Sequence, residues 1–290
     1  MNRQLRWQVV KERRIANYGY HLYDCFVQAP PKKAVILARG LGRRMRAEVE
    51  GVELSADQRS IADAGIKALM PVAGGKTMLE MIFANLAEAG FSEFCLVIGP
   101  EHEAIREYCA DSGLSVEFST QPEAKGTADA VLAAENWVDG ELFLVVNSDN
   151  LYPVESLRRL GESSRPAMLA FEREALIQHS NIATDRVASF ATVEIDADGN
   201  LSKIVEKPKM VAAGTFVSMN AWLFSPDIFD ACRVIAPSER GEYEITSAVQ
   251  YAIDHLGIKF SALKSYEGVL DLSNRADIES ASQMITAKTQ

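Results

Sequence analysis

Short apolar runs alternate with amphipathic segments over the first half of the chain. The runs are typical of buried strands, which we expect at 34–38, 94–98, 115–119 and 142–146. One helix face is marked by apolar side chains at helical spacing, at Leu79, Ile82, Phe83 and Leu86. An alanine-rich helix is expected at 126–137. This alternation predicts an α/β fold, with helices on both faces of a mainly parallel, Rossmann-like sheet.

After Pro153 the pattern changes to short strands that follow one another. We expect them at 168–171, 187–194, 201–205 and 216–224. The segment 196–200, Asp-Ala-Asp-Gly-Asn, is typical of a hairpin turn. A later helix would bury one face, formed by Ile245, Ala248, Val249, Ala252, Ile253 and Leu256. This half predicts a smaller mixed sheet that completes a pocket.

Residues 1–31 differ from the rest of the chain, with basic side chains outnumbering acidic ones and several aromatic residues. We interpret them as an N-terminal extension that packs on the surface or on a second subunit. An extension that binds an effector is the alternative. Pro30 and Pro31 mark the entry to the main domain at 32–290.

The composition, 48% hydrophobic and 24% charged over 290 residues, is that of an ordinary globular protein. A net charge of -10 argues against a nucleic-acid partner. No apolar run has membrane-spanning length, and the start of the chain lacks a secretory signal. The cysteines lack zinc or disulfide spacing. We therefore expect a cytoplasmic protein without a membrane partner, and a homo-oligomer stays open.

A loop rich in glycine and arginine follows the first expected strand. It contains Ala38, Gly40, Gly42, Arg43 and Arg44. Glycines let backbone N–H groups approach phosphate oxygens, and guanidinium groups bind phosphate through paired hydrogen bonds. Met45 stands where the dinucleotide motif needs its third glycine, and Gly75-Lys76-Thr77 lacks the first glycine of a P-loop. The loop therefore predicts a nucleotide-handling enzyme of another kind.

Further motifs follow this loop in a fixed order. They are ARGLGRRM (38–45), Lys67 in KALMPV, GGKTMLEMI (74–82), Gln121 with GTADA (126–130), VVNSDN (145–150), EKP (206–208), GEYEIT (241–246) and LDLSN (270–274). Together they resemble the sugar-1-phosphate nucleotidyltransferase family, which includes thymidylyl- and uridylyltransferases. The resemblance implies a GT-A-like fold, with a nucleotide-binding part at about 32–152 and a sugar-binding part with a small mixed sheet at about 153–290.

The resemblance also implies a reaction. A sugar 1-phosphate, by default glucose 1-phosphate, would attack the α-phosphorus of dTTP or UTP and release pyrophosphate. Because both reactants are anions, fixed cations and Mg²⁺ suit this reaction. Arg44 would hold the triphosphate, Arg43 would add charge, and Lys67 would contact phosphates near the reacting centre.

The remaining family positions would hold the metal and surround the two substrates. Asp149 and Asp271 would bind Mg²⁺, which prefers carboxylate ligands, although a turn or cap role is an equal alternative for Asp271. Gln121, with Gly126 and Thr127, would read uracil or thymine. On the sugar side the matching residues are Ala191, Glu206, Lys207, Asn220 and Glu242.

Some positions depart from the family pattern. Arg39 and Arg43 replace smaller residues, Ser148 replaces a glycine, and the segment 48–60 lengthens the connection to Lys67. We interpret that segment as a lid or an oligomer contact. A glycosyltransferase that consumes NDP-sugars is one alternative, but Asn147 replaces the first aspartate of its D-x-D motif. A non-catalytic homologue that binds a nucleotide and regulates a partner is the other.

Overall fold

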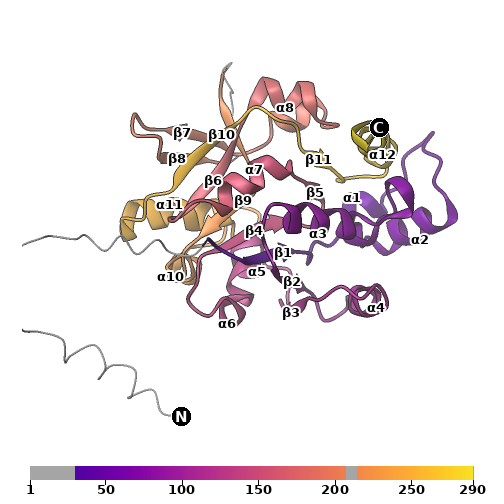
Figure 1. Cartoon of the computed structure of the whole chain (residues 1–290), viewed down its shortest axis with the longest axis horizontal. Helices are drawn as coiled ribbons and strands as arrows, with labels where there is room; N and C mark the ends of the chain where they lie inside the picture. Colours follow the sequence, from indigo (N-terminus) through magenta and orange to yellow (C-terminus); the bar gives the residue numbers. More distant parts are fainter. Residues whose placement is uncertain (1–29, 207–213, 290) are drawn as a thin grey trace, which may run out of the picture.

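The computed structural model describes residues 30–206 and 214–289, so nearly all of the predicted N-terminal extension, and Lys207, lie outside the described residues. The described residues form a nine-stranded sheet and a separate two-stranded ribbon (Figure 1). The sheet runs in the order β10 (Ser261–Ser265), β6 (Ala167–Glu172), β9 (Phe216–Phe224), β4 (Phe143–Asn147), β1 (Lys33–Leu37), β2 (Glu93–Ile98) and β3 (Glu117–Thr120).

The strands of the first half are parallel, since β1 pairs with β2 and β4, and β2 pairs with β3. Strand β9 is antiparallel to β4 and β6, whereas β10 is parallel to β6. A hairpin of β7 (Thr192–Ile195) and β8 (Leu201–Val205) pairs with β9. The predicted α/β class with a mainly parallel core is confirmed, and the strands of the second half extend the central sheet.

Side chains of the core strands alternate between two apolar layers. In β1, Ala34 and Ile36 belong to one layer and Val35 to the other, and all three are buried. Helices α3 (Met78–Glu88), α4 (Glu103–Asp111) and α7 (Val154–Gly161) contribute to the first layer. Helices α5 (Thr127–Ala133), α10 (Ile228–Val234) and α11 (Ile245–Leu256) contribute to the second. Helices therefore cover both faces, as predicted (Figure 1).

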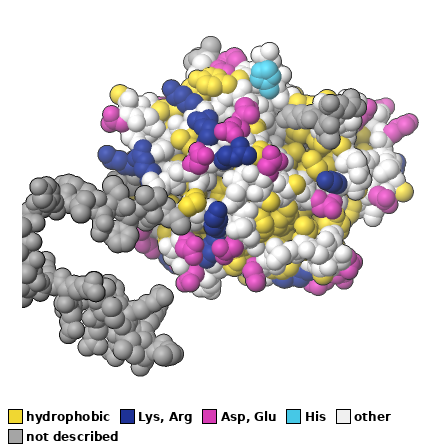
Figure 2. All heavy atoms as spheres, in the orientation of Figure 1, with side chains coloured by type: hydrophobic (Ala, Val, Ile, Leu, Met, Phe, Trp, Pro, Cys, Tyr) yellow, Lys and Arg dark blue, Asp and Glu magenta, His cyan; other side chains and the backbone are white. Residues whose placement is uncertain are grey.

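The remaining elements lie around the sheet and near its edges. They are α1 (Arg43–Arg46), α2 (Ala56–Ala64), the 3₁₀ turns η1 (Lys67–Leu69) and η2 (Ala73–Gly75), α6 (Glu135–Val138), α8 (Arg173–His179), α9 (Thr184–Val187), α12 (Asp277–Thr289), and the ribbon strands β5 (Asn150–Leu151) and β11 (Leu270–Asp271). None of the helices in the described part of the chain is long and apolar enough to cross a membrane. The face in Figure 2 carries basic side chains among acidic ones.

The structure corrects the bounds of several predicted elements. The strand expected at 115–119 runs from Glu117 to Thr120, and the helix expected at 126–137 is divided at Ala134. The strand expected at 187–194 was wrong over its first part, because Val187 is a buried residue of helix α9 and β7 begins only at Thr192. Leu256 is 42% exposed, since helix α11 ends there before Gly257.

The inserted segment 48–60 leads into α2, which packs on α1. Ser55 and Gln58 form a capping box at the start of α2. At its other end, the backbone of Gly65 touches Gly42, where a Cβ atom would fall on the Gly65 carbonyl oxygen. The Arg46 guanidinium donates to the carbonyl oxygen of Ala64. Helix α2 therefore supports the glycine loop; the roles of the segment as a lid or as a contact with a second subunit stay predictions.

We expect Gly42→Ala to lower the free energy of unfolding by about 3 kcal/mol, because the new methyl adds a steric clash to a left-handed backbone. Gly42 has a φ of 60°. Gly51→Ala is the matched control, since Gly51 has a φ of 78° but no atom within 4 Å of its added Cβ. The control should lose only about 1 kcal/mol. Equal losses in urea unfolding would contradict the close contact.

Candidate active site

A cavity of about 390 Å³ opens at the carboxyl ends of β1 and β4. Ligands of open α/β sheets bind at this edge. The cavity brings together most of the predicted site residues, namely Ala38, Gly40, Gly42, Arg43, Arg44, Lys67, Gln121, Gly126, Thr127, Asp149, Asn220 and Glu242. Ala191, Glu206 and Asp271 are not among its lining residues.

The glycine loop connects β1 to the short helix α1 at the cavity. Its start is fixed by the sheet, because Ala38 N donates to the Val97 carbonyl at 2.8 Å. Arg43 and Arg44 follow Gly42 and are exposed. Within the described residues neither guanidinium has a hydrogen bond or an ion pair. Two fixed positive charges are therefore available to an anionic ligand in the cavity.

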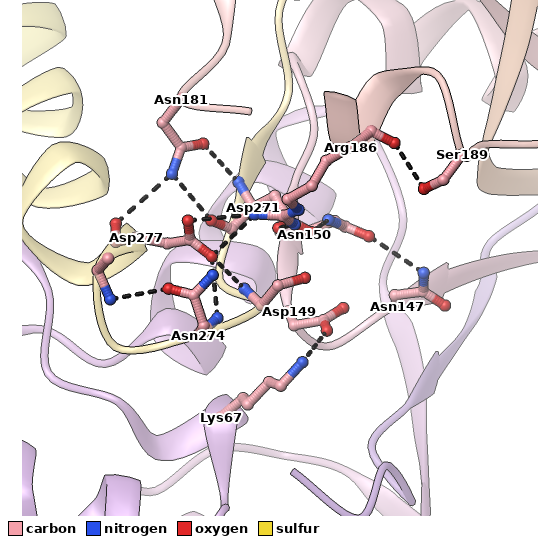
Figure 3. Close-up of polar contacts among 12 residues, drawn as sticks. Lys67, Asn147, Asp149, Asn150, Asn181, Arg186, Ser189, Asp271, Asn274 and Asp277 are labelled. Atoms are coloured by element: carbon pink, nitrogen blue, oxygen red, sulfur yellow. Dashed lines mark hydrogen bonds and ion pairs between the residues drawn. The ribbon is translucent and has the colours of Figure 1, made fainter. Parts of the chain in front are cut away.

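Lys67 and Asp149 form an ion pair that lines the cavity, with Lys67 Nζ 2.8 Å from Asp149 Oδ2 (Figure 3). Lys67 begins η1, two residues after the Gly65 contact, and Asp149 follows β4. Their side chains are 19% and 25% exposed, so both groups remain accessible from the cavity. The strand after which Asp149 stands was correctly predicted, whereas the partnership with Lys67 required the tertiary structure.

Asp271 reaches Asp149 through the two-stranded ribbon. Strand β11 pairs with β5, which places Asp271 opposite Asn150, and Leu272 N donates to the Asp149 carbonyl at 2.9 Å. The Asp271 carboxylate is only 8% exposed; its Oδ1 accepts from Asn150 Nδ2 at 2.8 Å, and its Oδ2 is paired with Arg186. Burial, together with the charge of Asp149, raises the pKa of the Asp271 carboxyl.

Gln121 has a fixed orientation beside the cavity. Its Nε2 donates to Asp129 Oδ2 at 2.7 Å and to the Gly126 carbonyl at 3.1 Å. Both amide hydrogens are therefore used, and Oε1 is left as an acceptor. A flipped amide would place Oε1 against the Asp129 carboxylate, which is unfavourable. Arg39 donates from Nε to the backbone carbonyl of Gln121 at 3.1 Å, and its Nη1 lies 2.6 Å from Glu101 Oε1.

Gly126 and Thr127 connect this region to the start of α11. Gly126 has a φ of 121°, and an added Cβ would lie 2.5 Å from the Tyr243 carbonyl oxygen. Ile245 N donates to Thr127 Oγ1 at 2.8 Å, so the threonine hydroxyl stabilises the first turn of α11. Both residues therefore have a structural role as well as a place in the cavity lining.

The predicted sugar-side residues divide into two groups. Asn220 and Glu242 line the cavity, and Arg240 joins Glu242 to Glu206 at distances of 3.7 and 4.0 Å. Ala191 is 5% exposed, and its carbonyl accepts from Ser218 N at 2.8 Å. The roles of these residues in binding a sugar phosphate stay predictions.

A family model for nucleotidyl transferase matches residues 33–287. The chain belongs to the nucleotidyl transferase family. It is 27% identical over 262 residues to UTP–glucose-1-phosphate uridylyltransferase AglF of Haloferax volcanii, covering 89% of this chain and 98% of that protein. Glucose-1-phosphate thymidylyltransferase of Streptomyces antibioticus is 29% identical over 229 residues, which are 77% of this chain and 58% of that protein.

The fold also resembles a solved structure of UDP-glucose pyrophosphorylase complexed with UDP-glucose. The TM-score is 0.69 at 18% identity, and the match covers 89% of this chain and 99% of that one. The family expected from the order of the motifs is thus confirmed, and the chain is an enzyme of the nucleotidyltransferase class. Family membership favours nucleotidyl transfer over the two alternatives raised by the sequence.

The two aspartates of this nucleotidyl transferase provide a partial fit to a divalent cation. Carboxylate oxygens are the ligands that Mg²⁺ prefers, and Asp149 presents one at the cavity. Asp271 is next to it, but each of its oxygens already has a donor. The described residues contain no group of three acidic, histidine or cysteine side chains that could hold a metal. Any metal here would therefore complete its coordination with water or with substrate oxygens.

Sequence reasoning missed several residues that shape this site. Arg186 pairs with Asp271, and Arg240 lies among three glutamates. Arg275 donates from Nε to the Met45 carbonyl at 2.9 Å and thereby ties the end of the β11 segment to α1. No motif identified these arginines, because each acts across the fold. Their only sequence signal is an arginine close to a predicted functional segment.

His102 lines the cavity and is 7% exposed. Its Nδ1 accepts from Gly99 N at 3.2 Å. Burial, and then the charges of Arg39 and Arg46, lower the pKa of His102 from its ordinary 6.5, although Glu101 opposes them. The unfolded chain therefore binds this proton more readily, and the contribution of His102 to stability falls as the pH drops below about 6.5.

We expect His102→Asn to reduce the loss of stability between pH 7 and pH 5. The asparagine Oδ1 can keep the bond from Gly99 N, but it does not titrate. Urea unfolding of both proteins at several pH values measures the difference in slope. An identical pH dependence in the two proteins would contradict a lowered pKa of His102.

Proposed function

We propose that this protein transfers a nucleotidyl group from dTTP or UTP to glucose 1-phosphate, in a reaction that depends on Mg²⁺. The observation that supports this proposal is the single cavity that gathers the glycine loop, the Lys67–Asp149 pair and Gln121. The named activities of the curated relatives, uridylyl and thymidylyl transfer to glucose 1-phosphate, are of the same kind.

In the proposed reaction, an oxygen of the sugar phosphate attacks the α-phosphorus as the bond to the β-phosphate breaks. Pyrophosphate leaves with the electron pair of that bond, so no nucleophile on the protein is required. Arg44, supported by Arg43, would bind the triphosphate and stabilise the charge on the departing pyrophosphate. Lys67, next to Asp149 at 2.8 Å, is suited to contact the α-phosphate.

Mg²⁺ would supply charge neutralisation on the phosphates, and Asp149 is the side chain at the cavity that could hold it. Asp271 would be its second ligand, after releasing Asn150 or Arg186 from one of its carboxylate oxygens. The chain's remaining task is positioning, since the two anionic substrates must meet in line. The buried ribbon of β5 and β11 gives Asp149 a fixed place for this purpose.

The orientation of Gln121 favours uracil or thymine over cytosine. Its Oε1 is the acceptor left over by the bonds to Asp129 and Gly126. Uracil and thymine carry a hydrogen on N3 that can donate to this oxygen, whereas N3 of cytosine is itself an acceptor. A site built for one hydrogen-bond pattern rejects a base that leaves its polar groups unpaired.

On the sugar side, Asn220 and Glu242 line the cavity and Glu206 is joined to Glu242 through Arg240. The carboxylates would accept hydrogen bonds from sugar hydroxyls, and the Ala191 backbone would contact one more. Lys207, which lies outside the described residues, would meet the sugar phosphate. This group of residues is the support for a hexose 1-phosphate as acceptor.

Arg44→Ala and Asp149→Asn should each lower kcat/KM by about a thousandfold or more, because each removes a charge proposed to act in the transition state. Pyrophosphate release from dTTP, UTP, CTP, ATP or GTP with a panel of sugar phosphates measures this. Arg59→Ala is the matched control, since Arg59 is an exposed arginine on α2 and does not line the cavity. Unchanged rates in Arg44→Ala and Asp149→Asn would contradict the roles proposed for these two residues. The proposed reaction would be refuted if the wild-type protein released no pyrophosphate with any combination of nucleotide and sugar phosphate.

Asp129→Asn should reduce the preference for UTP over CTP by about tenfold, because an asparagine can donate to Gln121 and so permit its amide to turn. The ratio of kcat/KM for the two nucleotides measures this preference. Glu123→Gln is the control, since Glu123 pairs at the surface with Lys125. A ratio that stays at the wild-type value would contradict the proposed orientation of Gln121.

A further inference from the structure

Arg186 on helix α9 bridges two buried carboxylates (Figure 3). Its Nη1 lies 3.1 and 3.0 Å from the two carboxylate oxygens of Asp277, and its Nη2 pairs with Asp271 Oδ2. The Arg186 side chain is 20% exposed, while those of Asp271 and Asp277 are 8% and 11% exposed. The contacts of Arg186 with the two carboxylates are therefore largely shielded from solvent.

Asp277 is held in place independently of Arg186. Its Oδ2 accepts from Ser273 N at 2.8 Å and from Asn274 N at 2.9 Å, at the start of α12. Asp271 is held differently, by the Asn150 amide on Oδ1 and by Arg186 on Oδ2. If Oδ2 of Asp271 were needed elsewhere, Arg186 Nη1 would keep both carboxylate oxygens of Asp277 as partners. The arginine thus has one permanent partner and one that it can release.

Asp149 at the cavity and Asp271 beside it each have one basic partner. Lys67 pairs with Asp149, and Arg186 pairs with Asp271 (Figure 3). Neighbouring carboxylates repel one another, and cations that lie close to them offset this repulsion. Lysine and arginine supply those charges in the protein alone. A divalent cation shared by both aspartates would supply the same charge, and Oδ2 of Asp271 would be its ligand if Asn150 keeps Oδ1.

We propose that Arg186 is a resident cation that competes with the divalent metal for Asp271 and so sets the metal affinity of the site. This proposal rests on the proposed metal-dependent function. Metal binding transfers Oδ2 of Asp271 from Arg186 to the metal, and Arg186 stays on Asp277. Because a guanidinium keeps its charge at any working pH, Arg186 does not lose its hold on Asp271 by deprotonation. It is displaced from Oδ2 only when the metal binds there. Arg186 is a positioning residue in this scheme.

The test is a titration of the nucleotide-free, full-length protein with Mn²⁺, followed by electron paramagnetic resonance. Arg186→Met should bind Mn²⁺ about tenfold more tightly than the wild type, because the competing charge is gone. The measurement is made in 0.15 M salt, where the Debye length of about 8 Å screens distant charges. Arg233→Met is the matched control and should bind as the wild type does, since Arg233 pairs at the surface with Glu135 and Asp230.

Asp271→Asn separates competition from a general effect of charge. The gain from Arg186→Met should disappear when Asp271→Asn is also present, and Asp271→Asn alone should weaken Mn²⁺ binding. If Arg186→Met raised the Mn²⁺ affinity equally in the wild type and in Asp271→Asn, the proposal would be overturned. The same holds if the Arg186→Met protein binds Mn²⁺ no more tightly than the wild type. Arg186→Gln tests the same point if the methionine variant does not fold. Glutamine carries no charge, so tighter Mn²⁺ binding is expected, and wild-type affinity would overturn the proposal.

The failure of the proposed function would look different. In that case Mn²⁺ would bind to none of these proteins, whether UTP is present or absent, and Arg186 would have nothing to compete with. Saturable Mn²⁺ binding that is insensitive to Arg186 would instead refute only the role of this arginine. Circular dichroism of each variant at the titration temperature confirms that the compared proteins are folded.

Discussion

Two neighbouring carboxylates, Asp149 at the cavity and the buried Asp271 beside it, lie close together, and their mutual repulsion governs the arrangement around them. Asp149 and Asp271 are adjacent because β5 and β11 pair, and each is matched by a cation from another part of the chain. Leaving the buried charge of Asp271 without a partner would cost several kcal/mol. The positions of Lys67 on η1 and of Arg186 on α9 therefore follow from the same electrostatic constraint.

A second constraint is steric and fixes the cations relative to the sheet. Gly42 and Gly65 touch through their backbones, so the arginine loop packs directly against the segment that carries Lys67. Arg275 adds a hydrogen bond from the segment after β11 to the Met45 carbonyl. The loop, the lysine and the second aspartate are thus connected by contacts that do not involve a substrate. Preorganisation of this kind suits a reaction that depends on positioning.

Much of the fold and part of the site could be predicted from local patterns. The strands at 34–38, 94–98 and 142–146 were found because residues buried on both faces form continuous apolar runs. The glycine loop and Asp149 were found because they directly follow such strands. The strand expected at 187–194 was wrong in its first part, since one buried valine on a short helix has the same local appearance.

The sequence by itself determined the α/β class, the family and many of the residues that line the cavity, because these depend on strand patterns and on motifs in a fixed order. Tertiary structure decided the charge partners. Arg186 has no motif, yet it occupies the oxygen of Asp271 that a metal would use. The order of the motifs predicts that Gln121 reads the base, but its orientation depends on Asp129 and the Gly126 carbonyl. Side chains from distant segments set these electrostatic relations, and only the folded chain brings them within bonding distance.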